Sequence, residues 1–253
     1  MENDGSPQSE QILGIRFFNG TAKEAVARMA ENGGLLVAPS GTCFERFLQD
    51  EEYRRAIVAA DVVLPDSGLM VVLWRLLRGR SINRISGLAY VKELSGLNNI
   101  RGNNPTIWVL PYAKAREKLL AWGSKRSIPI DPADCYIAPI YSPTVNDESL
   151  LALIDSRQPK HVVIAIGAGA QEKLGLYLRE HLACRPAIHC IGGALGFVTG
   201  DQVAIPDWAD RLYLGWFLRL SSQPRVMLPR LWKGRVLPWL MLRYGDKLPP
   251  GRY

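Results

Sequence analysis

The chain alternates short apolar runs with amphipathic stretches. The apolar runs predict strands, at residues 12–18, 35–38, 61–64, 106–110, 135–139, 161–166 and 187–191. Apolar positions at helical spacing predict the elements between them, at residues 21–32, 44–59, 69–77, 113–122, 148–156 and 171–181. Continuous apolar strands that alternate with helices are typical of a parallel sheet covered on both faces. We therefore predict an α/β fold with a Rossmann-like parallel sheet and helices on both faces.

The composition divides the chain near residue 205. Residues 1–10 are polar and acidic, and we predict a flexible leader there. Residues 11–204 hold the alternating strands and helices. Residues 205–253 are rich in basic and aromatic side chains, and the prolines at 224, 229 and 238 are expected to divide them into short helices. We treat this last part as a C-terminal appendage. Its composition is typical of a segment at a membrane surface, although a solvated charged face with buried tryptophans is the alternative.

The bulk composition restricts the classes of protein. Of 253 residues, 47% are hydrophobic and the net charge is +7, which favours a globular protein with an anionic partner. No CxxC pair occurs, and the histidines complete no metal-ligand spacing, so we expect no metal cofactor and free thiols in a reducing compartment. The N-terminus lacks the pattern of a secretory signal, and no apolar run approaches the ~18 residues of a membrane span. These features predict a cytoplasmic protein.

Four predicted loops follow strands and are candidates for a binding site. They lie at residues 39–42, 65–68, 167–171 and 192–193. In open parallel sheets, ligands bind beyond the carboxyl ends of the strands. The glycines of the last two loops, Gly167, Gly192 and Gly193, would let backbone N–H groups approach a phosphate at a helix N-terminus. Alternatively, these glycines only permit tight turns.

Asp66 is the candidate catalytic residue, because it follows an apolar strand within a Pro-Asp-Ser-Gly turn. A carboxylate there could take the proton from an attacking hydroxyl, or it could cap the following helix. Gln171 could bond a nucleotide or a sugar. Glu172 could line the same site or simply interact with the helix dipole. Arg84 could hold a phosphate or be solvated.

Five segments keep their order and spacing between about residues 12 and 235. They are ADVVLPDSG at 60–68, RISG at 84–87, HVVIAIGAGAQEK at 161–173, IGGALGFVTG at 191–200, and LGWFLR at 214–219 with the following PR at 224–225. These segments resemble conserved elements of the WecG/TagA/CpsF glycosyltransferases. The resemblance implies a Rossmann-like catalytic domain at residues 11–204.

The resemblance also implies an activity and partners. A member of this family would transfer a sugar, such as N-acetylmannosamine or another N-acetylhexosamine, from a UDP-sugar to a polyprenyl-diphosphate-linked acceptor. The transfer would invert the anomeric carbon and require no metal, in the synthesis of surface polysaccharide at the inner face of the plasma membrane. Asp66 corresponds to the catalytic base, and Arg84 and Gln171 correspond to pocket residues. Arg219 and Arg225 belong to the part that contacts the lipid diphosphate and the anionic membrane. Self-association is a further implication.

The chain departs from the family pattern at several polar positions, now occupied by Ala38, Ala89, Gly196, Ala204 and Gly215. Ser40 and Thr42 could supply replacement hydroxyls to the substrate pocket. A changed donor and a non-catalytic relative both remain open. Two other classes are disfavoured. A dinucleotide-dependent oxidoreductase should show GxGxxG after its first strand, and a nucleic-acid-binding module should show a known motif rather than basic residues confined to one end.

Overall fold

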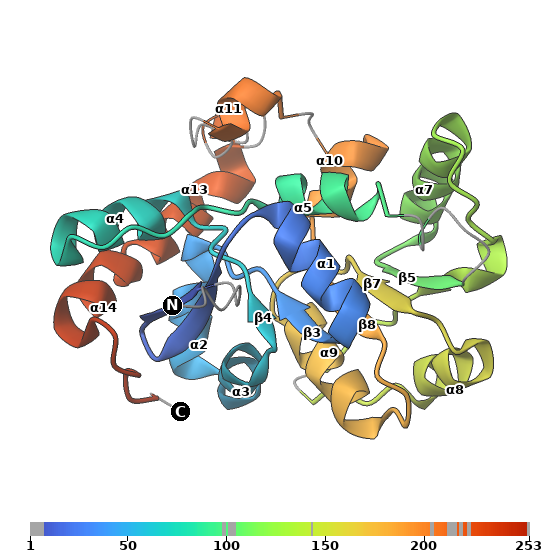
Figure 1. The fold of residues 1–253 in the computed structure, drawn as a ribbon, viewed down its shortest axis with the longest axis horizontal. Coiled ribbons are helices and arrows are strands. Elements are labelled where there is room, and N and C mark those ends of the chain that lie inside the picture. Colours follow the sequence, from blue (N-terminus) through green and yellow to red (C-terminus); the bar gives the residue numbers. More distant parts are fainter. Residues whose placement is uncertain are drawn as a thin grey trace, which may run out of the picture.

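The computed structural model describes residues 8–97, 100, 105–142, 144–202, 205–211, 217, 220–221 and 224–251. At its centre is an eight-stranded sheet of order β1-β2-β4-β3-β8-β7-β5-β6 (Figure 1). The strands are β1 (Gln8–Ile12), β2 (Ile15–Asn19), β3 (Gly34–Val37), β4 (Val62–Val63), β5 (Thr106–Leu110), β6 (Cys135–Ile137), β7 (His161–Ile164) and β8 (Ala187–Cys190). All neighbours pair in parallel except β1 and β2. The predicted α/β fold with a largely parallel sheet is confirmed.

Helices cover both faces of the sheet, as Figure 1 shows for α1 in front and α9 behind. One face carries α1 (Ala22–Asn32), α5 (Gly87–Leu94), α7 (Ala113–Lys125) and α10 (Ala194–Thr199). The other carries α2 (Phe44–Gln49), α3 (Glu51–Ala59), α4 (Gly68–Arg78), α8 (Glu148–Arg157), α9 (Ala170–His181) and α14 (Val236–Tyr244). Along β3, Leu35 and Val37 belong to one core and Leu36 to the other. Because successive side chains point to opposite faces, a strand buried on both sides is apolar throughout.

The first predicted strand, at residues 12–18, is in fact a hairpin. Leu13 and Gly14 both have positive φ angles, 53° and 74°, and they reverse the chain between β1 and β2. Two residues of positive φ form the tight turn that suits the twist of paired strands. Strand β1 includes residues 8–10, which we had assigned to the leader.

Local capping explains where several helices begin. Thr21 and Glu24 form a capping box at the start of α1. The helix expected at residues 44–59 is divided at Asp50, whose side chain accepts a hydrogen bond from the Tyr53 N–H at 3.0 Å and starts α3. Pro229 lies inside α13 (Pro224–Gly234), so it does not divide that segment as expected. The short helices α5 and α10 were not predicted.

The C-terminal segment packs against the sheet domain. Leu237, Leu240 and Met241 of α14 are fully buried in the core that α2, α3, α4 and α9 share. The N–H groups of Leu13 and Gly14 donate to the carbonyls of Gly245 and Asp246, each at 2.8 Å. The boundary near residue 205 stays a prediction, but α14 shares one apolar core with the residues before it.

Candidate active site

The sheet order brings the four predicted loops together at one edge. Strands β4, β3, β8 and β7 are consecutive neighbours and run parallel, so their carboxyl ends lie side by side. The loops at 65–68, 39–42, 192–193 and 167–170 follow these strands in that order. This is the edge at which open α/β sheets bind their ligands.

Asp66 lies in the turn after β4, and its carboxylate is held by another helix. Its Oδ1 accepts a hydrogen bond from the N–H of Gly87, the first residue of α5, at 3.0 Å. Helix α4 is capped instead by Ser67, whose hydroxyl accepts from the Met70 N–H. The alternative that Asp66 caps the helix after it is therefore wrong. The carboxylate lies at the N-terminus of α5, where the helix dipole attracts an anion.

Gly87 also connects Asp66 to the glycine turn after β8. A side chain at Gly87 would approach the Cβ of Ala194 to 3.0 Å, so the two backbones are in close contact. Ala194 directly follows Gly192 and Gly193. Gly87 therefore lies between the Asp66 carboxylate, which its N–H binds, and the first residue of α10, and only a small residue fits at position 87.

Arg84 links the Asp66 turn to α11 (Asp207–Arg211) in the C-terminal segment. Its Nε donates to the Asp66 carbonyl at 3.0 Å, and its Nη2 forms an ion pair with Asp210 Oδ1 at 3.0 Å. The Ser86 hydroxyl donates to the other carboxylate oxygen of Asp210. The Arg84 and Asp210 side chains are only 15% and 16% exposed, so water screens this pair weakly. Arg84 thus binds a carboxylate of its own chain.

Glu172 and Gln171 are buried beneath the loop after β7. Glu172 Oε2 accepts from the Gly169 N–H at 2.6 Å, and its Oε1 accepts from the Gln171 amide at 3.0 Å. Burial raises the pKa of the Glu172 carboxyl above its ordinary value, while the hydrogen bonds from Gln171 and Gly169 oppose that rise. Glu172 therefore caps α9, as the alternative to a substrate role foresaw.

Gln171 presents a buried acceptor toward the neighbouring turn. Its Oε1 has no hydrogen-bond partner among the described residues, although the side chain is 3% exposed. A side chain at Gly192 would approach that oxygen to 3.0 Å. Buried polar atoms are seldom left unpaired, so this oxygen marks a place where a ligand donor or water would bind.

The glycine loop after β7 has unusual backbone geometry. Gly167 and Gly169 have φ angles of 112° and 100°, which favour glycine. Arg46 of α2 donates to the Ala168 carbonyl at 2.6 Å and fixes the loop. No described atom lies within 4 Å of the position that a Gly167 side chain would occupy. In the turn after β8, by contrast, Gln202 occupies the position that a Gly193 side chain would take.

Ser40 and Thr42 lie in the loop after β3, which continues into the short helix η1 (Gly41–Cys43). Their hydroxyls form a hydrogen bond with each other at 3.0 Å. A side chain at Gly41 would approach the Ser67 hydroxyl to 2.7 Å, so this loop contacts the Asp66 turn. The loop that carries the two predicted pocket hydroxyls therefore contacts the turn that carries Asp66.

The structure does not bring two of the predicted residues into this cluster, one of them because it is not described. Arg219 lies outside the described residues. Arg225 is exposed in the first turn of α13. Sequence reasoning missed Gly87, Arg46 and Asp210. Only Gly87 had a signal, because it belongs to the RISG segment.

The remaining titratable groups that the structure describes do not form a metal site. Among the described residues, no group of three or more His, Cys, Asp or Glu side chains could hold a metal ion. All four cysteines are free thiols. His161 and His189 stack inside the sheet domain, and His189 Nδ1 bonds the Tyr90 hydroxyl at 2.8 Å.

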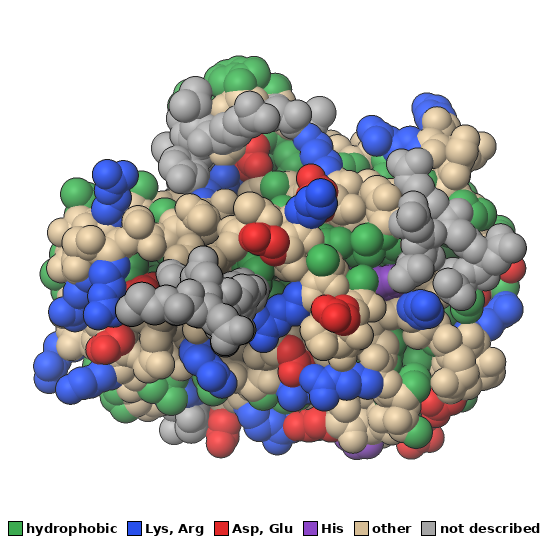
Figure 2. Space-filling model, viewed as in Figure 1, with side chains coloured by type: hydrophobic (Ala, Val, Ile, Leu, Met, Phe, Trp, Pro, Cys, Tyr) green, Lys and Arg blue, Asp and Glu red, His purple; other side chains and the backbone are tan. Residues whose placement is uncertain are grey.

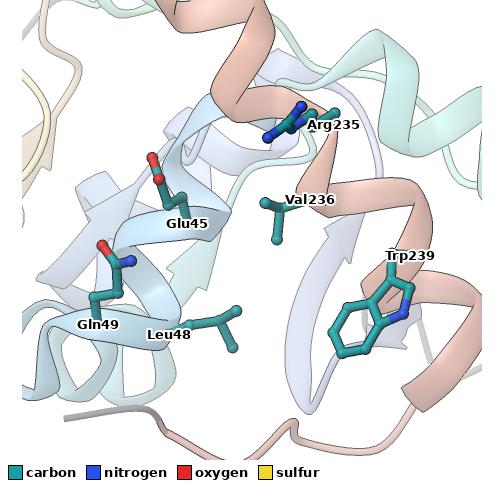
Figure 3. Close-up of a pocket in the computed structure, with 6 residues that line it drawn as sticks. All are labelled: Glu45, Leu48, Gln49, Arg235, Val236 and Trp239. Atoms are coloured by element: carbon teal, nitrogen blue, oxygen red, sulfur yellow. The ribbon is translucent and has the colours of Figure 1, made fainter.

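A cavity of about 540 Å³ lies between α2 and the C-terminal helices (Figure 3). It is formed by α2 on one side and by the junction of α13 and α14 on the other. The residues that line it are Glu45, Leu48, Gln49, Arg235, Val236 and Trp239. Neither Asp66 nor the glycine turns belong to its lining.

The sheet is open and largely parallel, and a fixed carboxylate and glycine turns lie at the ends of its central strands. These features define a ligand-binding α/β protein of the Rossmann-like class. Comparison with known proteins gives the family. Residues 10–249 match the glycosyl transferase WecG/TagA/CpsF family, and the chain belongs to it. It is an enzyme of a family that uses UDP-sugar donors and builds surface polysaccharide on lipid-linked acceptors.

A curated relative supports this assignment. The chain is similar to the N-acetylglucosaminyldiphosphoundecaprenol N-acetyl-β-D-mannosaminyltransferase of Bacillus subtilis (strain 168), with 27% identity over 186 residues. The match covers 70% of this chain and 67% of the relative. The resemblance stated from the sequence segments is thus confirmed.

Proposed function

We propose that this enzyme transfers N-acetylmannosamine from its UDP-linked donor to N-acetylglucosamine carried on a polyprenyl diphosphate. The relative that matches most of the chain is named for this transfer. The observation that supports it best is the position of Asp66. Its carboxylate is held at the N-terminus of α5 by Gly87, which also packs against Ala194, the residue after the Gly192–Gly193 turn.

In the proposed reaction, the donor diphosphate lies over the loop at 167–171 and the Gly192–Gly193 turn, where backbone N–H groups offset its charge. Asp66 takes the proton from the acceptor hydroxyl as that oxygen attacks the anomeric carbon. The bond to the diphosphate breaks on the opposite side, so UDP leaves and the configuration inverts. The unpaired Gln171 oxygen would accept a hydrogen bond from the donor.

The lipid diphosphate needs cations near the acceptor side of the site. We assign this role to Arg219 and Arg225, which the family resemblance places in the part that meets the lipid. Arginine suits a diphosphate because its planar fork of N–H donors binds two oxygens at once.

Asp66→Asn tests the proposed base. The variant keeps the shape of the side chain but cannot accept the proton, so we expect transfer to fall at least about 1,000-fold while UDP affinity stays within about two-fold. Release of UDP in the presence of a lipid-linked acceptor measures the first, and calorimetry measures the second. Asp155→Asn, at an exposed position of α8, is the matched control. Wild-type transfer by Asp66→Asn would remove Asp66 from the mechanism.

We also propose that α4 and the C-terminal helices bind an anionic membrane surface. Exposed apolar side chains occur on α4, α13 and α14; they are Leu69, Val72, Leu76, Leu228, Trp232, Trp239 and Leu242. Exposed arginines accompany them, at positions 75, 78, 225, 235 and 243. Figure 2 shows basic and hydrophobic side chains together over the end of the molecule formed by α4 and α14. This combination is typical of interfacial helices.

Vesicle flotation tests the membrane proposal. No described helix is long and apolar enough to cross a bilayer. We expect co-flotation with anionic vesicles that weakens as salt rises. Leu76→Glu should reduce it, whereas Val58→Glu on α3 should not, since Val58 is equally apolar and 46% exposed but lies on another helix. Equal flotation of all three proteins would contradict the proposal. Cytoplasmic location and self-association stay predictions.

A further inference from the structure

The cavity between α2 and α14 has an apolar centre and a polar margin. Leu48, Val236 and Trp239 face a common space, while Glu45, Gln49 and Arg235 stand around it (Figure 3). Its volume of about 540 Å³ falls in the range of ~300–1,000 Å³ that is usual for small-molecule sites. The apolar walls favour hydrocarbon over sugar or phosphate, because burial of apolar surface drives binding.

Both walls of the cavity lead along the chain to the loop after β3, which belongs to the candidate active site. Helix α2 begins directly after η1, the loop that carries Thr42. On the opposite wall, a side chain at Gly234 would touch the Thr42 methyl group at 3.8 Å, and Arg235 and Val236 follow at once. The end of the cavity lined by Glu45 and Arg235 therefore lies close to the contact between Thr42 and Gly234.

The outer rim leads toward the surface that we assign to the membrane. Trp239, on the cavity wall, is 45% exposed, and Leu242 on the same helix is 65% exposed. At the mouth, the Arg235 guanidinium stacks over the Trp232 ring, 3.7 Å from its centroid. Apolar surface thus extends from the exterior into the cavity, with a cation at the entrance.

We propose that this cavity binds the isoprene units nearest the diphosphate of the lipid-linked acceptor. The inference rests on the proposed function, because it takes a polyprenyl diphosphate as the acceptor. With the diphosphate at the carboxyl edge of the sheet, the attached chain must pass between the active site and the membrane. The cavity supplies an apolar path that begins beside Thr42 and ends at Trp239.

Binding of farnesyl diphosphate, measured by calorimetry, tests the cavity without requiring transfer. Val236→Trp fills the space and should weaken binding at least ten-fold. Val58→Trp makes the same substitution at an exposed position outside the cavity, and it should bind as the wild type does. If Val236→Trp fails to fold, Trp239→Ala serves as the second variant. It removes one wall of the cavity, at a half-exposed position, and it should also weaken binding at least ten-fold.

Transfer assays then connect the cavity to the acceptor. The ratio of kcat/KM for farnesyl-diphosphate-linked N-acetylglucosamine to that for its methyl-diphosphate analogue measures the contribution of the lipid. We expect Val236→Trp to reduce this ratio at least ten-fold and Val58→Trp to preserve it.

The outcomes separate the two proposals. Equal affinity of all variants for farnesyl diphosphate would overturn the cavity assignment even if transfer occurs. Oleate that binds as tightly as farnesyl diphosphate, with the same sensitivity to Val236→Trp, would make the occupant an acyl chain and also overturn it. Absence of transfer to either acceptor, with the expected loss of farnesyl diphosphate affinity, would overturn the proposed function and leave the cavity assignment supported.

Discussion

The two sides of the candidate active site are held in place by different parts of the chain. On the glycine side, Glu172 binds Gly169 and Gln171, all within the sheet domain. On the Asp66 side, Arg84 is held by Asp210, which lies 126 residues away on α11. The first arrangement is local, and the second depends on the C-terminal segment.

This difference predicts that the two sides can be disturbed separately. Loss of the Asp210 contact should loosen the turn that carries Asp66 without affecting the loop after β7. Donor binding would then persist while transfer fails. Under the proposed function, such an arrangement would limit wasteful hydrolysis of the donor, because the chemical machinery would be complete only with the C-terminal segment docked.

Glu172→Ala should have the largest effect on stability. It removes the side chain that binds Gly169 and Gln171 on the glycine side of the site. The buried N–H of Gly169 and the amide of Gln171 lose their acceptor, so we expect unfolding to become easier by about 3 kcal/mol. Urea denaturation measures this, and UDP affinity should fall as well. Glu172→Gln, which retains one acceptor oxygen, should lose less. Unchanged UDP affinity in the alanine variant would separate this loop from the donor.

Asp210→Ala removes the carboxylate that holds Arg84 on the Asp66 side of the site. It leaves the partly buried guanidinium of Arg84 without its carboxylate, which should cost about 2 kcal/mol of stability. We expect kcat to fall at least about ten-fold while UDP affinity stays within about two-fold. Asp155→Ala at an exposed position of α8 serves as the control. A parallel loss of UDP affinity would show that the two sides are not independent.

Acid should destabilise the protein through the buried pair His161 and His189, which contacts the Asp66 side of the site through Tyr90. Tyr90 bonds His189 and belongs to α5, which holds Asp66. Burial lowers the pKa of His161 to about 4, and burial also lowers that of His189. The unfolded chain, with histidine pKa near 6.5, therefore binds more protons than the folded protein below that pH.

Stability should consequently fall as the pH drops from about 6.5 toward 4, by about 1 kcal/mol per pH unit for each histidine. Urea denaturation at several pH values measures the slope, and His161→Gln should make it shallower. A slope that is the same in both proteins would exclude His161 as a source of the acid sensitivity.

Thr21→Ala should have the smallest effect. It removes the capping box of α1, which is remote from both sides of the site, and it should cost about 1 kcal/mol. Thermal unfolding measures the loss, and Thr21→Ser should restore most of it. Transfer at a temperature where the variant is folded should equal that of the wild type, and a large loss there would show that the α1 cap is coupled to the site.

The sheet and the position of Asp66 could be predicted because their signals are local. Strands buried on both faces are apolar along their whole length, and an acid after such a strand must lie at the carboxyl edge. The turn at Leu13 and Gly14 was missed because Leu13 has a positive φ, a conformation that a leucine gives no reason to expect.

The partners of the site residues could not be predicted for a different reason. Asp210 binds Arg84 across 126 residues of sequence, and no periodicity connects the two. The cavity beside α2 likewise depends on how α14 packs, because its walls come from two distant helices. Local sequence patterns therefore predicted the sheet and its strand-end loops, whereas the contacts that couple the C-terminal segment to the site became visible only in the structure.

The join between the first hairpin and the last helix has a consequence for how the molecule is made. The Gln11 amide and the Asp246 carbonyl, 235 residues apart, lie at 3.1 Å beside the backbone bonds of Leu13 and Gly14. During synthesis the hairpin leaves the ribosome early, yet these donors find their acceptors only after α14 has emerged. The β1–β2 hairpin is thus synthesised before the other strands, but its hydrogen bonds to the end of α14 form only after that helix has been made.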